Sequence, residues 1–282
     1  MEDKRIPIPE DSETLKFLYD TLAGRLILKS LSGRTLSRIC GSYLDSSFSK
    51  WLIKPFIKKN NIRIEDYEPV CYQSFNECFS RRIKKELRPI DTESDHLIAP
   101  CDGLLSAYKI TGKEVLPIKQ SKYSVKELLR NRKLADEYED GICLVFRLCV
   151  NHYHRYSYID DGVKGINHFI RGRLHTVRPI ALKRYPVFVE NCREYTAIMT
   201  ENFGKVIQME VGALLVGKIK NYHQNRKIKR GQEKGKFLYG GSTVIVLLKK
   251  DAAVLPDWLF EATDSECEVP VKMGEQIGIR KK

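Results

Sequence analysis

Two patterns of hydrophobic and polar residues divide the chain. Between residues 12 and 60, Leu15, Leu18, Leu22 and Leu26 recur at spacings of three and four, which predicts amphipathic helices with one apolar face. From residue 95 onward, short apolar and β-branched runs alternate with glycine turns, which predicts β-strands. Because the helical pattern comes first and the strand patterns follow, the sequence predicts an α+β fold with a mainly antiparallel β core and an N-terminal helical region. The expected strands lie within 96–103, 141–150, 195–200, 206–217 and 242–248.

The helical and β-rich patterns place a domain boundary near residue 70. Residues 1–70 form the predicted amphipathic helical region, and residues 71–282 form the predicted β-rich domain. Within the second part, Lys218–Lys236 is dense in lysine and arginine and predicts an exposed loop. We expect a soluble or peripheral protein, because no apolar run approaches the roughly 18–20 residues that span a bilayer and the first 14 residues do not resemble a secretory signal.

The net charge of +13 implies an anionic partner, either nucleic acid or an acidic membrane face. Nucleic acid is the less favoured partner, because no zinc-finger or RNA-binding motif is present. Residues 48–59 mix bulky apolar residues, among them Trp51 and Phe56, with lysines, as in segments that lie at a membrane interface. The alternative is an amphipathic helix packed on its own domain. Eight scattered cysteines without a CxxC pair predict buried thiols in a reducing compartment.

A Gly240-Gly-Ser-Thr243 turn leads into the apolar run that ends at Leu248. Taken alone, it is an ordinary hairpin turn, because glycine and serine are common turn residues. Further motifs occur in a fixed order along residues 70–250: Pro100-Cys-Asp-Gly103, Tyr153-His-Arg155, Asp161-Gly162, Gly172–Pro179, Asn191–Glu194, Phe203-Gly204, Val211–Gly217 and Gly235-Lys-Phe237.

Together, these motifs resemble the phosphatidylserine decarboxylase family. The resemblance implies a proenzyme in which the Ser242 hydroxyl attacks the Gly241 carbonyl and converts the peptide bond into an ester. β-Elimination then frees a chain of 241 residues, and loss of ammonia leaves a pyruvoyl group on the remaining chain of 41 residues. The two chains are expected to stay together as a heterodimer. The pyruvoyl carbonyl is the implied cofactor, with neither pyridoxal phosphate nor a metal.

The implied reaction converts phosphatidylserine into phosphatidylethanolamine and CO2 through a Schiff base on the pyruvoyl group. A carboxy-lyase of this kind is expected to work on an anionic phospholipid membrane, as a peripheral protein at its cytoplasmic face. Three alternatives stay open: a pyruvoyl decarboxylase for a soluble amino acid or another aminolipid, a relative that does not mature, and a basic nucleic-acid-binding protein.

The family uses an aspartate and a histidine to assist the serine, in the manner of a catalytic triad. Asp102 matches the aspartate, although an Asp-Gly pair is also a common turn. The family pattern Tyr-His-Arg-x-His has its first histidine at His154, and Ser157 stands where the second is usual. His154 is therefore assigned to decarboxylation, by steering the carboxylate or protonating the carbanion.

The sequence leaves several candidates for the base that activates Ser242 in self-cleavage. Another histidine can serve, with His152, His168 and His175 as the nearest candidates; alternatively, Ser157 relays a proton through water, or the chain does not mature. We prefer another histidine, and we expect His175 to border the pocket. His152 and His154 alternate as on one strand face, but no carboxylate or cysteine completes a metal-ligand spacing, so a metal site is not favoured.

Overall fold

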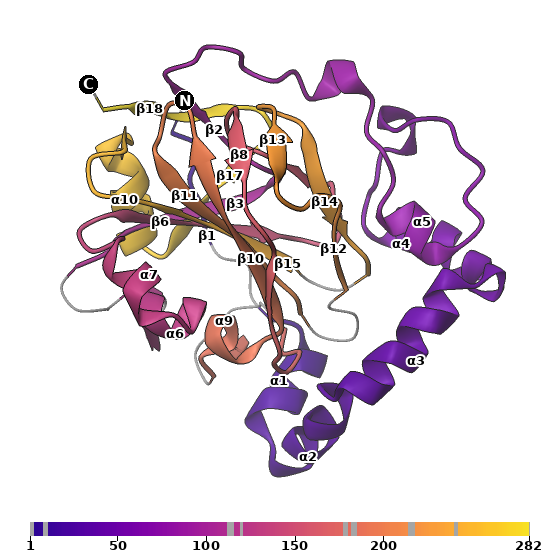
Figure 1. The fold of residues 1–282 in the computed structure, drawn as a ribbon. Helices are drawn as coiled ribbons and strands as arrows, with labels where there is room; N and C mark the ends of the chain where they lie inside the picture. The colour runs from indigo at the N-terminus through magenta and orange to yellow at the C-terminus, as the bar shows by residue number, and fades with distance from the viewer. Residues whose placement is uncertain are drawn as a thin grey trace.

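The computed structural model describes residues 3–7, 11–111, 116–118, 121–176, 180–181, 185–213, 218–239 and 242–281. Within these residues, antiparallel sheets form the body of the molecule and a series of short helices precedes them (Figure 1). The predicted α+β class, with a mainly antiparallel β core and an N-terminal helical region, is confirmed. The division at residue 70 stays a prediction.

A ten-stranded sheet forms the centre, in the order β1-β17-β3-β6-β15-β11-β10-β8-β13, with β9 paired to β10. β15 lies between β6 and β11 and is buried along its whole length, which explains its uninterrupted apolar sequence. The strands are β1 (Ile6–Pro7), β3 (Gly103–Lys109), β6 (Ile142–Leu148), β8 (Gly162–Lys164), β9 (His168–Ile170), β10 (Arg193–Thr200), β11 (Lys205–Val211), β13 (Arg226–Ile228), β15 (Ser242–Leu248) and β17 (Cys267–Val271).

Three smaller sheets surround the central one. One has the order β12-β14-β7, a second has the order β16-β18-β2, and β4 pairs with β5. The strands are β2 (His96–Ile98), β4 (Leu116–Ile118), β5 (Ser121–Tyr123), β7 (Arg155–Ser157), β12 (Ile219–Asn221), β14 (Glu233–Phe237), β16 (Ala253–Val254) and β18 (Gln276–Arg280).

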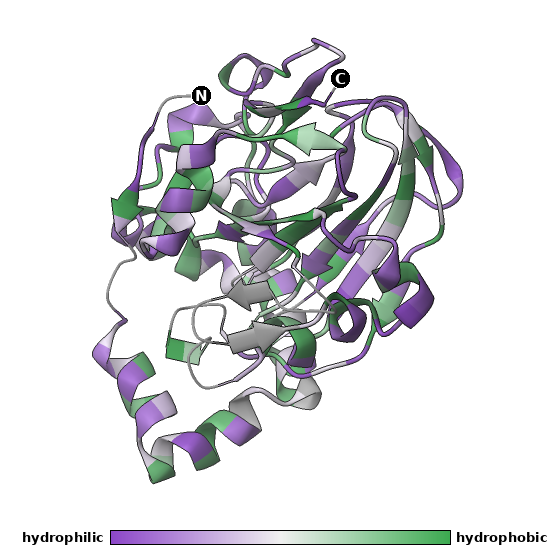
Figure 2. Ribbon diagram, turned by 90° about the vertical axis from the view of Figure 1, so that its left-hand side faces the viewer, coloured by the Kyte–Doolittle hydropathy of each residue, from purple (hydrophilic) through white to green (hydrophobic). Residues whose placement is uncertain are grey.

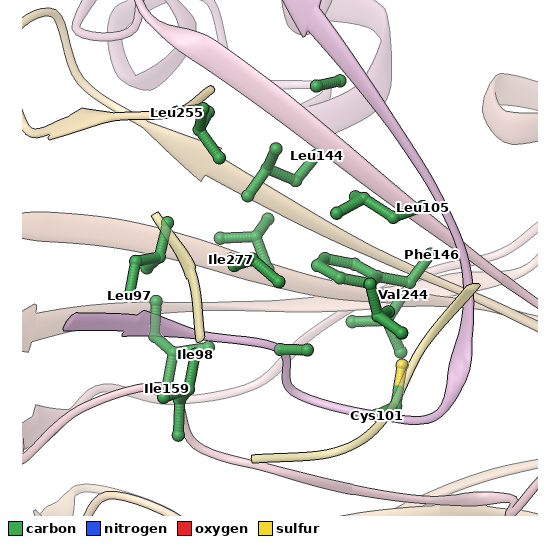
Figure 3. Close-up of a cluster of buried hydrophobic side chains, with 14 of the residues drawn as sticks. Leu97, Ile98, Cys101, Leu105, Leu144, Phe146, Ile159, Val244, Leu255 and Ile277 are labelled. Atoms are coloured by element: carbon green, nitrogen blue, oxygen red, sulfur yellow. The ribbon is translucent and has the colours of Figure 1, made fainter. Parts of the chain in front are cut away.

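The two faces of the central sheet bury separate hydrophobic clusters, because successive side chains of a strand point to opposite faces. On β15, Ile245 and Leu247 belong to one cluster, whereas Val244, Val246 and Leu248 belong to the other. Figure 3 shows the second cluster, in which Val244 lies with residues of β2, β3, β6 and β18. The sheet is therefore covered on both sides.

Helices cover both faces of the central sheet (Figure 1). α1, α6, α7 and α9 contribute to the first cluster, and α10 contributes Leu259 and Ala262 to the second. Ser124 caps α6 with a capping box, which satisfies backbone donors at the start of that helix. The helices are α1 (Glu13–Asp20), α6 (Val125–Leu129), α7 (Arg132–Asp136), α9 (Val187–Glu190) and α10 (Asp257–Asp264).

Residues 12–60 form several short helices, which do not share one continuous apolar face. α1 ends at Thr21, whose extended backbone (ψ 154°) redirects the chain. Leu15 and Leu18 therefore pack against the first cluster, whereas Leu22 and Leu26 are 76% and 72% exposed. The pieces that follow α1 are α2 (Leu22–Leu31), α3 (Arg34–Asp45), the 3₁₀ helix η1 (Ser47–Leu52) and α4 (Ile53–Lys59).

We call α2, α3 and η1 the N-terminal arm. It begins at the first cluster, to which α2 contributes Leu28, and α3 then runs along the edge of the molecule (Figure 1). Hydrophobic and hydrophilic residues alternate along the helices at the lower edge of the molecule in Figure 2. Phe56, expected at a membrane interface, instead packs against Phe75 at 5.0 Å in a small cluster under α5 (Phe75–Phe79). Among the described residues, no helix is long and apolar enough to cross a bilayer.

The prediction of an exposed loop over Lys218–Lys236 is wrong. This segment contains β12, β13 and β14, and Lys234 is fully buried. β14 carries a β-bulge between Glu233 and Gly235, so that Lys234 turns into the protein while its neighbours remain paired with β7. Glycine at 235 permits the close approach of Lys220, whose carbonyl oxygen would lie 2.3 Å from an added Cβ.

Candidate active site

Ser242 begins β15, a strand that is buried along its whole length. It is paired with Leu148 of β6 and is 0% exposed. Its Oγ is buried and makes no hydrogen bond to any described residue. The run Ser-Thr-Val-Ile-Val favours a strand because β-branched residues pack well on a pleated surface. Gly241, the other half of the expected cleavage site, lies outside the described residues.

The register of the sheet brings Asp102 to the same end as Ser242. Leu104 of β3 pairs with Arg147 of β6, which pairs with Thr243 of β15. Asp102 lies two residues before Leu104, at the start of β3, where the three strands reach the same edge of the sheet. The sequence prediction that groups Asp102 with Ser242 is thus consistent with the register.

Arg88 binds the Asp102 carboxylate with both arms of its guanidinium group. Nε donates to Oδ1 at 2.7 Å and Nη2 donates to Oδ2 at 2.5 Å. The backbone N–H of Met273 also donates to Oδ1, at 3.0 Å. Asp102 is therefore an ion-paired carboxylate at the edge of the site, and Arg88 is a partner that the sequence analysis did not identify.

His152 and His154 do not alternate on a strand as predicted; both lie in the turn that precedes β7. Nδ1 of His152 accepts a hydrogen bond from the Cys149 N–H at 3.1 Å. The proton of neutral His152 is therefore on Nε2. Burial lowers the pKa of His152, and the nearby Asp102 carboxylate opposes this effect.

His154 has the opposite tautomer. Its Nδ1 lies 2.9 Å from the carbonyl oxygen of His152, which can only accept, so Nδ1 carries the proton. Nε2 keeps its lone pair, is buried and has no hydrogen-bond partner among the described residues. Burial lowers the pKa of His154 well below its usual range, so the ring is neutral at pH 7. Phe79 covers the ring, with the centroids 4.0 Å apart.

Ser157 is buried on β7 and is bound to the turn that leads to Asp102. Its backbone N–H donates to the Pro100 carbonyl at 2.7 Å, and its hydroxyl donates to the same oxygen at 3.3 Å. The Gln208 side chain donates to the Ser157 carbonyl at 3.1 Å. Ser157 thus joins β7 to the Asp102 turn and to β11.

His175 is held in place by the side chain of Asn191. The Asn191 side chain bonds the backbone N–H and C=O of His175 at 2.8 Å each, and it also donates to the Gly212 carbonyl at 2.8 Å. Gly212 follows Val211, the residue of β11 that pairs with Thr243. His175 is therefore fixed close to the end of β11 that borders Ser242.

The His175 ring is buried and stacks on Tyr185 at 4.5 Å. Neither ring nitrogen makes a hydrogen bond to the described residues, although Nε2 lies 3.5 Å from the Glu190 carboxylate. Burial, with a smaller effect of Arg173, lowers the pKa of His175 to about 4. His168, by contrast, is exposed on β9 and stacks on Tyr195. The register across β10 and β11 places His168 level with Ile245 of β15, and therefore away from Ser242.

Known proteins match this chain over most of its length. The sequence pattern of the family described as phosphatidylserine decarboxylase matches residues 75–279, which contain Asp102, His154 and Ser242. The chain belongs to this family. It is 47% identical to phosphatidylserine decarboxylase proenzyme 2 of Clostridium acetobutylicum, over 94% of this chain and 91% of that protein. It is 40% identical to the phosphatidylserine decarboxylase proenzymes of Clostridium botulinum and Clostridium perfringens, over 94–95% of this chain and 92% of each relative.

The resemblance inferred from the ordered motifs is thereby confirmed.

The structure also shows two buried charged residues near Ser242 that the motifs did not indicate. Glu210 of β11 and Lys234 of β14 are both 0% exposed and form a 2.6 Å ion pair. Burial raises the pKa of Glu210, an effect that Lys234 opposes. The only sequence signal for Lys234 was the following glycine, which marks a possible bulge.

Proposed function

We propose that this chain is a phosphatidylserine decarboxylase that cleaves itself between Gly241 and Ser242 and converts phosphatidylserine into phosphatidylethanolamine and CO2. The observation that carries the proposal is the buried Ser242 Oγ, which bonds no described residue. Leaving a buried hydroxyl unbonded costs about 1–3 kcal/mol, so such a group calls for an explanation. Attack on the preceding carbonyl provides one, and the relatives are named proenzymes.

The residues at the start of β15 fit a pyruvoyl group at position 242. The strand pairs with β6 and would hold the group at its end, on the face that also carries Leu148 and Val244. The Ser242 Oγ has no competing partner among the described residues. When present, this group supplies a carbonyl that accepts the electron pair left by the departing CO2. The surrounding protein excludes water and orients the headgroup.

We propose His154 as the base that takes the Ser242 proton, whereas the sequence favoured another histidine for this step and assigned His154 to decarboxylation. Its Nε2 has a free lone pair, whereas the neutral His152 ring already carries its proton on Nε2. Ser242 faces the side of the sheet that carries Leu148 and Val244, and β7, which follows His154 directly, adds Tyr156 to the same cluster. The His175 ring lies against Tyr19, which belongs to the cluster on the opposite face. The link through Tyr156 to the cluster below Ser242 supports His154 as the base.

The topology supports a stable heterodimer after cleavage. The expected 41-residue chain contains β15, which lies between β6 and β11 of the larger chain. It also contains β17, which lies between β1 and β3, and β18, which pairs with β2. Three strands inserted into the sheets of the larger chain would keep the two products together without a covalent link.

We propose that the N-terminal arm docks on an anionic membrane as a peripheral contact. The arm exposes large apolar side chains, with Phe48 80%, Trp51 67% and Ile39 63% exposed. Exposed lysines lie along the same segment and would attract anionic headgroups at about 1 kcal/mol each. The cytoplasmic face, with its negative lipids, suits this charge. The lysines are Lys29 and Lys50 in the arm, and Lys54, Lys58 and Lys59 in α4, which follows it.

The function is tested by incubating the purified protein with vesicles that contain phosphatidylserine and measuring phosphatidylethanolamine and CO2. The matched control is Ser242→Ala, which keeps the strand but removes the hydroxyl. Free serine, offered in parallel, distinguishes a lipid decarboxylase from one that acts on a soluble amino acid. Product formation by the wild type but not by the alanine variant is expected, and equal activity of the two proteins would refute the proposal.

A further inference from the structure

Glu210 lies next to Ser242 on the same face of the central sheet. In the β11–β15 pair, Glu210 is directly opposite Val244, and Ser242 is two residues before Val244. Residues two apart on a strand share a face, so the two side chains are diagonal neighbours, with a spacing of about 7–8 Å. The expected carbonyl at position 242 would thus form beside a buried carboxylate.

The two oxygens of the Glu210 carboxylate differ sharply in their contacts. Oε2 accepts from Lys234 Nζ at 2.6 Å and from Asn221 Nδ2 at 3.0 Å. Oε1 is buried and bonds nothing among the described residues. One oxygen is therefore saturated by donors, and the other is left as a free acceptor inside the protein. The nearby Gln208 Oε1, also on β11, is buried and unbonded in the same way among those residues.

Lys234 and Asn221 hold Glu210 in place. The β-bulge in β14 turns Lys234 inward, and its amine donates both to Glu210 and to the side-chain Oδ1 of Asn221, the latter at 2.9 Å. Asn221 in turn donates to Glu194 at 2.8 Å and accepts from the Tyr156 hydroxyl at 3.3 Å. A fully buried lysine that pairs with one carboxylate keeps that carboxylate ionised where it would otherwise take up a proton.

We propose that Glu210 is the residue that binds the ammonium group of the substrate, through its free Oε1. This inference rests on the proposed function, which places a carbonyl at position 242. An ammonium group needs an anionic acceptor in a site without water. It must also lose one proton before its nitrogen can attack a carbonyl. Transfer of that proton to Oε1 leaves a neutral amine with a lone pair and a neutral Glu210 carboxyl, while Lys234 keeps its charge.

The assignment predicts that the site distinguishes amines that carry a positive charge from amines that do not. Amines that arrive as cations need Glu210, whereas uncharged nucleophiles do not. Methoxyamine is uncharged at neutral pH and condenses with an accessible carbonyl, with loss of water. A short-chain phosphatidylserine, by contrast, carries the ammonium group and can be fixed to the same carbonyl as a secondary amine by cyanoborohydride, again with loss of water. The mass of the 41-residue chain reports both reactions.

The experiment compares the wild type with Glu210→Gln. The matched control is Glu194→Gln, because Glu194 pairs directly with Glu210 on β10, shares the Asn221 contact and lies one strand further from Ser242. We expect all three proteins to be cleaved to the same extent and to react with methoxyamine at the same rate. In Glu210→Gln alone, fixation of the lipid should slow about tenfold or more, because a charge-assisted contact to the ammonium is lost.

Equal lipid fixation by wild type and Glu210→Gln would overturn the inference. So would an equal loss toward both reagents, or the same loss in Glu194→Gln, because each indicates a general disturbance of the buried network. If Glu210→Gln does not fold with Lys234 left unpaired, the double variant Glu210→Gln/Lys234→Met replaces it. Failure of both variants to be cleaved would also overturn the inference, by placing Glu210 in folding or cleavage. A wild type that reacts with neither reagent would refute the proposed function itself.

Discussion

Arg88 and Asp102 form a two-pronged ion pair at the edge of the site, with donor–acceptor distances of 2.7 and 2.5 Å. Both side chains are largely buried, at 15% and 9% exposure. A carboxylate in this setting depends on its partner, because removing one member of a buried pair leaves an uncompensated charge. Asp102 therefore relies on Arg88 for its charge compensation.

Replacing Arg88 with methionine should lower the free energy of unfolding by about 3–5 kcal/mol, the usual cost of breaking a buried pair. Urea denaturation of the Ser242→Ala protein measures this without interference from cleavage. Arg82→Met is the control, because Arg82 is 48% exposed and its contact with Glu233 is a surface pair that contributes at most about 1 kcal/mol. Equal effects of the two substitutions would contradict the dependence of Asp102 on Arg88.

His154→Gln should slow self-cleavage by roughly 100-fold or more, the lower range for loss of a general base. Glutamine keeps a donor for the His152 carbonyl but has no basic nitrogen at the Nε2 position. The uncleaved fraction after purification and timed incubation is the measurement, by denaturing gel or mass. His175→Gln is the matched comparison and should cleave at nearly the wild-type rate. The reverse order of the two variants would assign the base to His175.

Acid stability should depend on His175. Its pKa of about 4 in the folded protein lies below the ordinary value of 6.5, so the unfolded chain binds more protons between these values. Stability from this group is therefore complete above pH 6.5 and is lost as pH falls toward 4, by roughly 3 kcal/mol in all. His175→Gln should flatten the dependence of the unfolding free energy on pH in this window. An unchanged slope would show that the ring titrates normally.

Docking of the N-terminal arm should depend on its exposed apolar residues. Phe48→Gln combined with Leu22→Gln should reduce co-flotation with vesicles containing anionic lipid, because these side chains are 80% and 76% exposed and have little role in the core. Met199→Gln, at a 57% exposed position on β10, should leave flotation unchanged. Binding of the double variant at the wild-type level would place the membrane contact elsewhere.

Sequence patterns predicted the parts of the site that are local. Ser242 and Asp102 were proposed because each lies in a short motif that resembles the family pattern, and the strand patterns of β6, β11 and β15 follow directly from their apolar runs. The two histidines of the Tyr153 motif were found, but their turn conformation was not, because alternation over three residues is too short to distinguish a strand from a turn.

The residues that the sequence did not indicate contact partners that lie far away in the sequence. Arg88 reaches Asp102 across 14 positions, and Lys234 reaches Glu210 across 24. Lys234 also lies in a segment whose composition predicts solvent exposure, and only the bulge in β14 turns it inward. Likewise, the break at Thr21 decides which leucines of the helical pattern are buried, and a periodic pattern does not reveal such a break. These features depend on tertiary pairing.

The central claim is that Ser242 cuts the chain before itself. Intact-mass spectrometry of the denatured protein tests it most directly, with Ser242→Ala beside the wild type. The account predicts two wild-type chains, residues 1–241 and residues 242–282, the second blocked by a pyruvoyl group, and a single alanine-variant chain near 32.6 kDa. A single unbroken wild-type chain with an intact serine would contradict it.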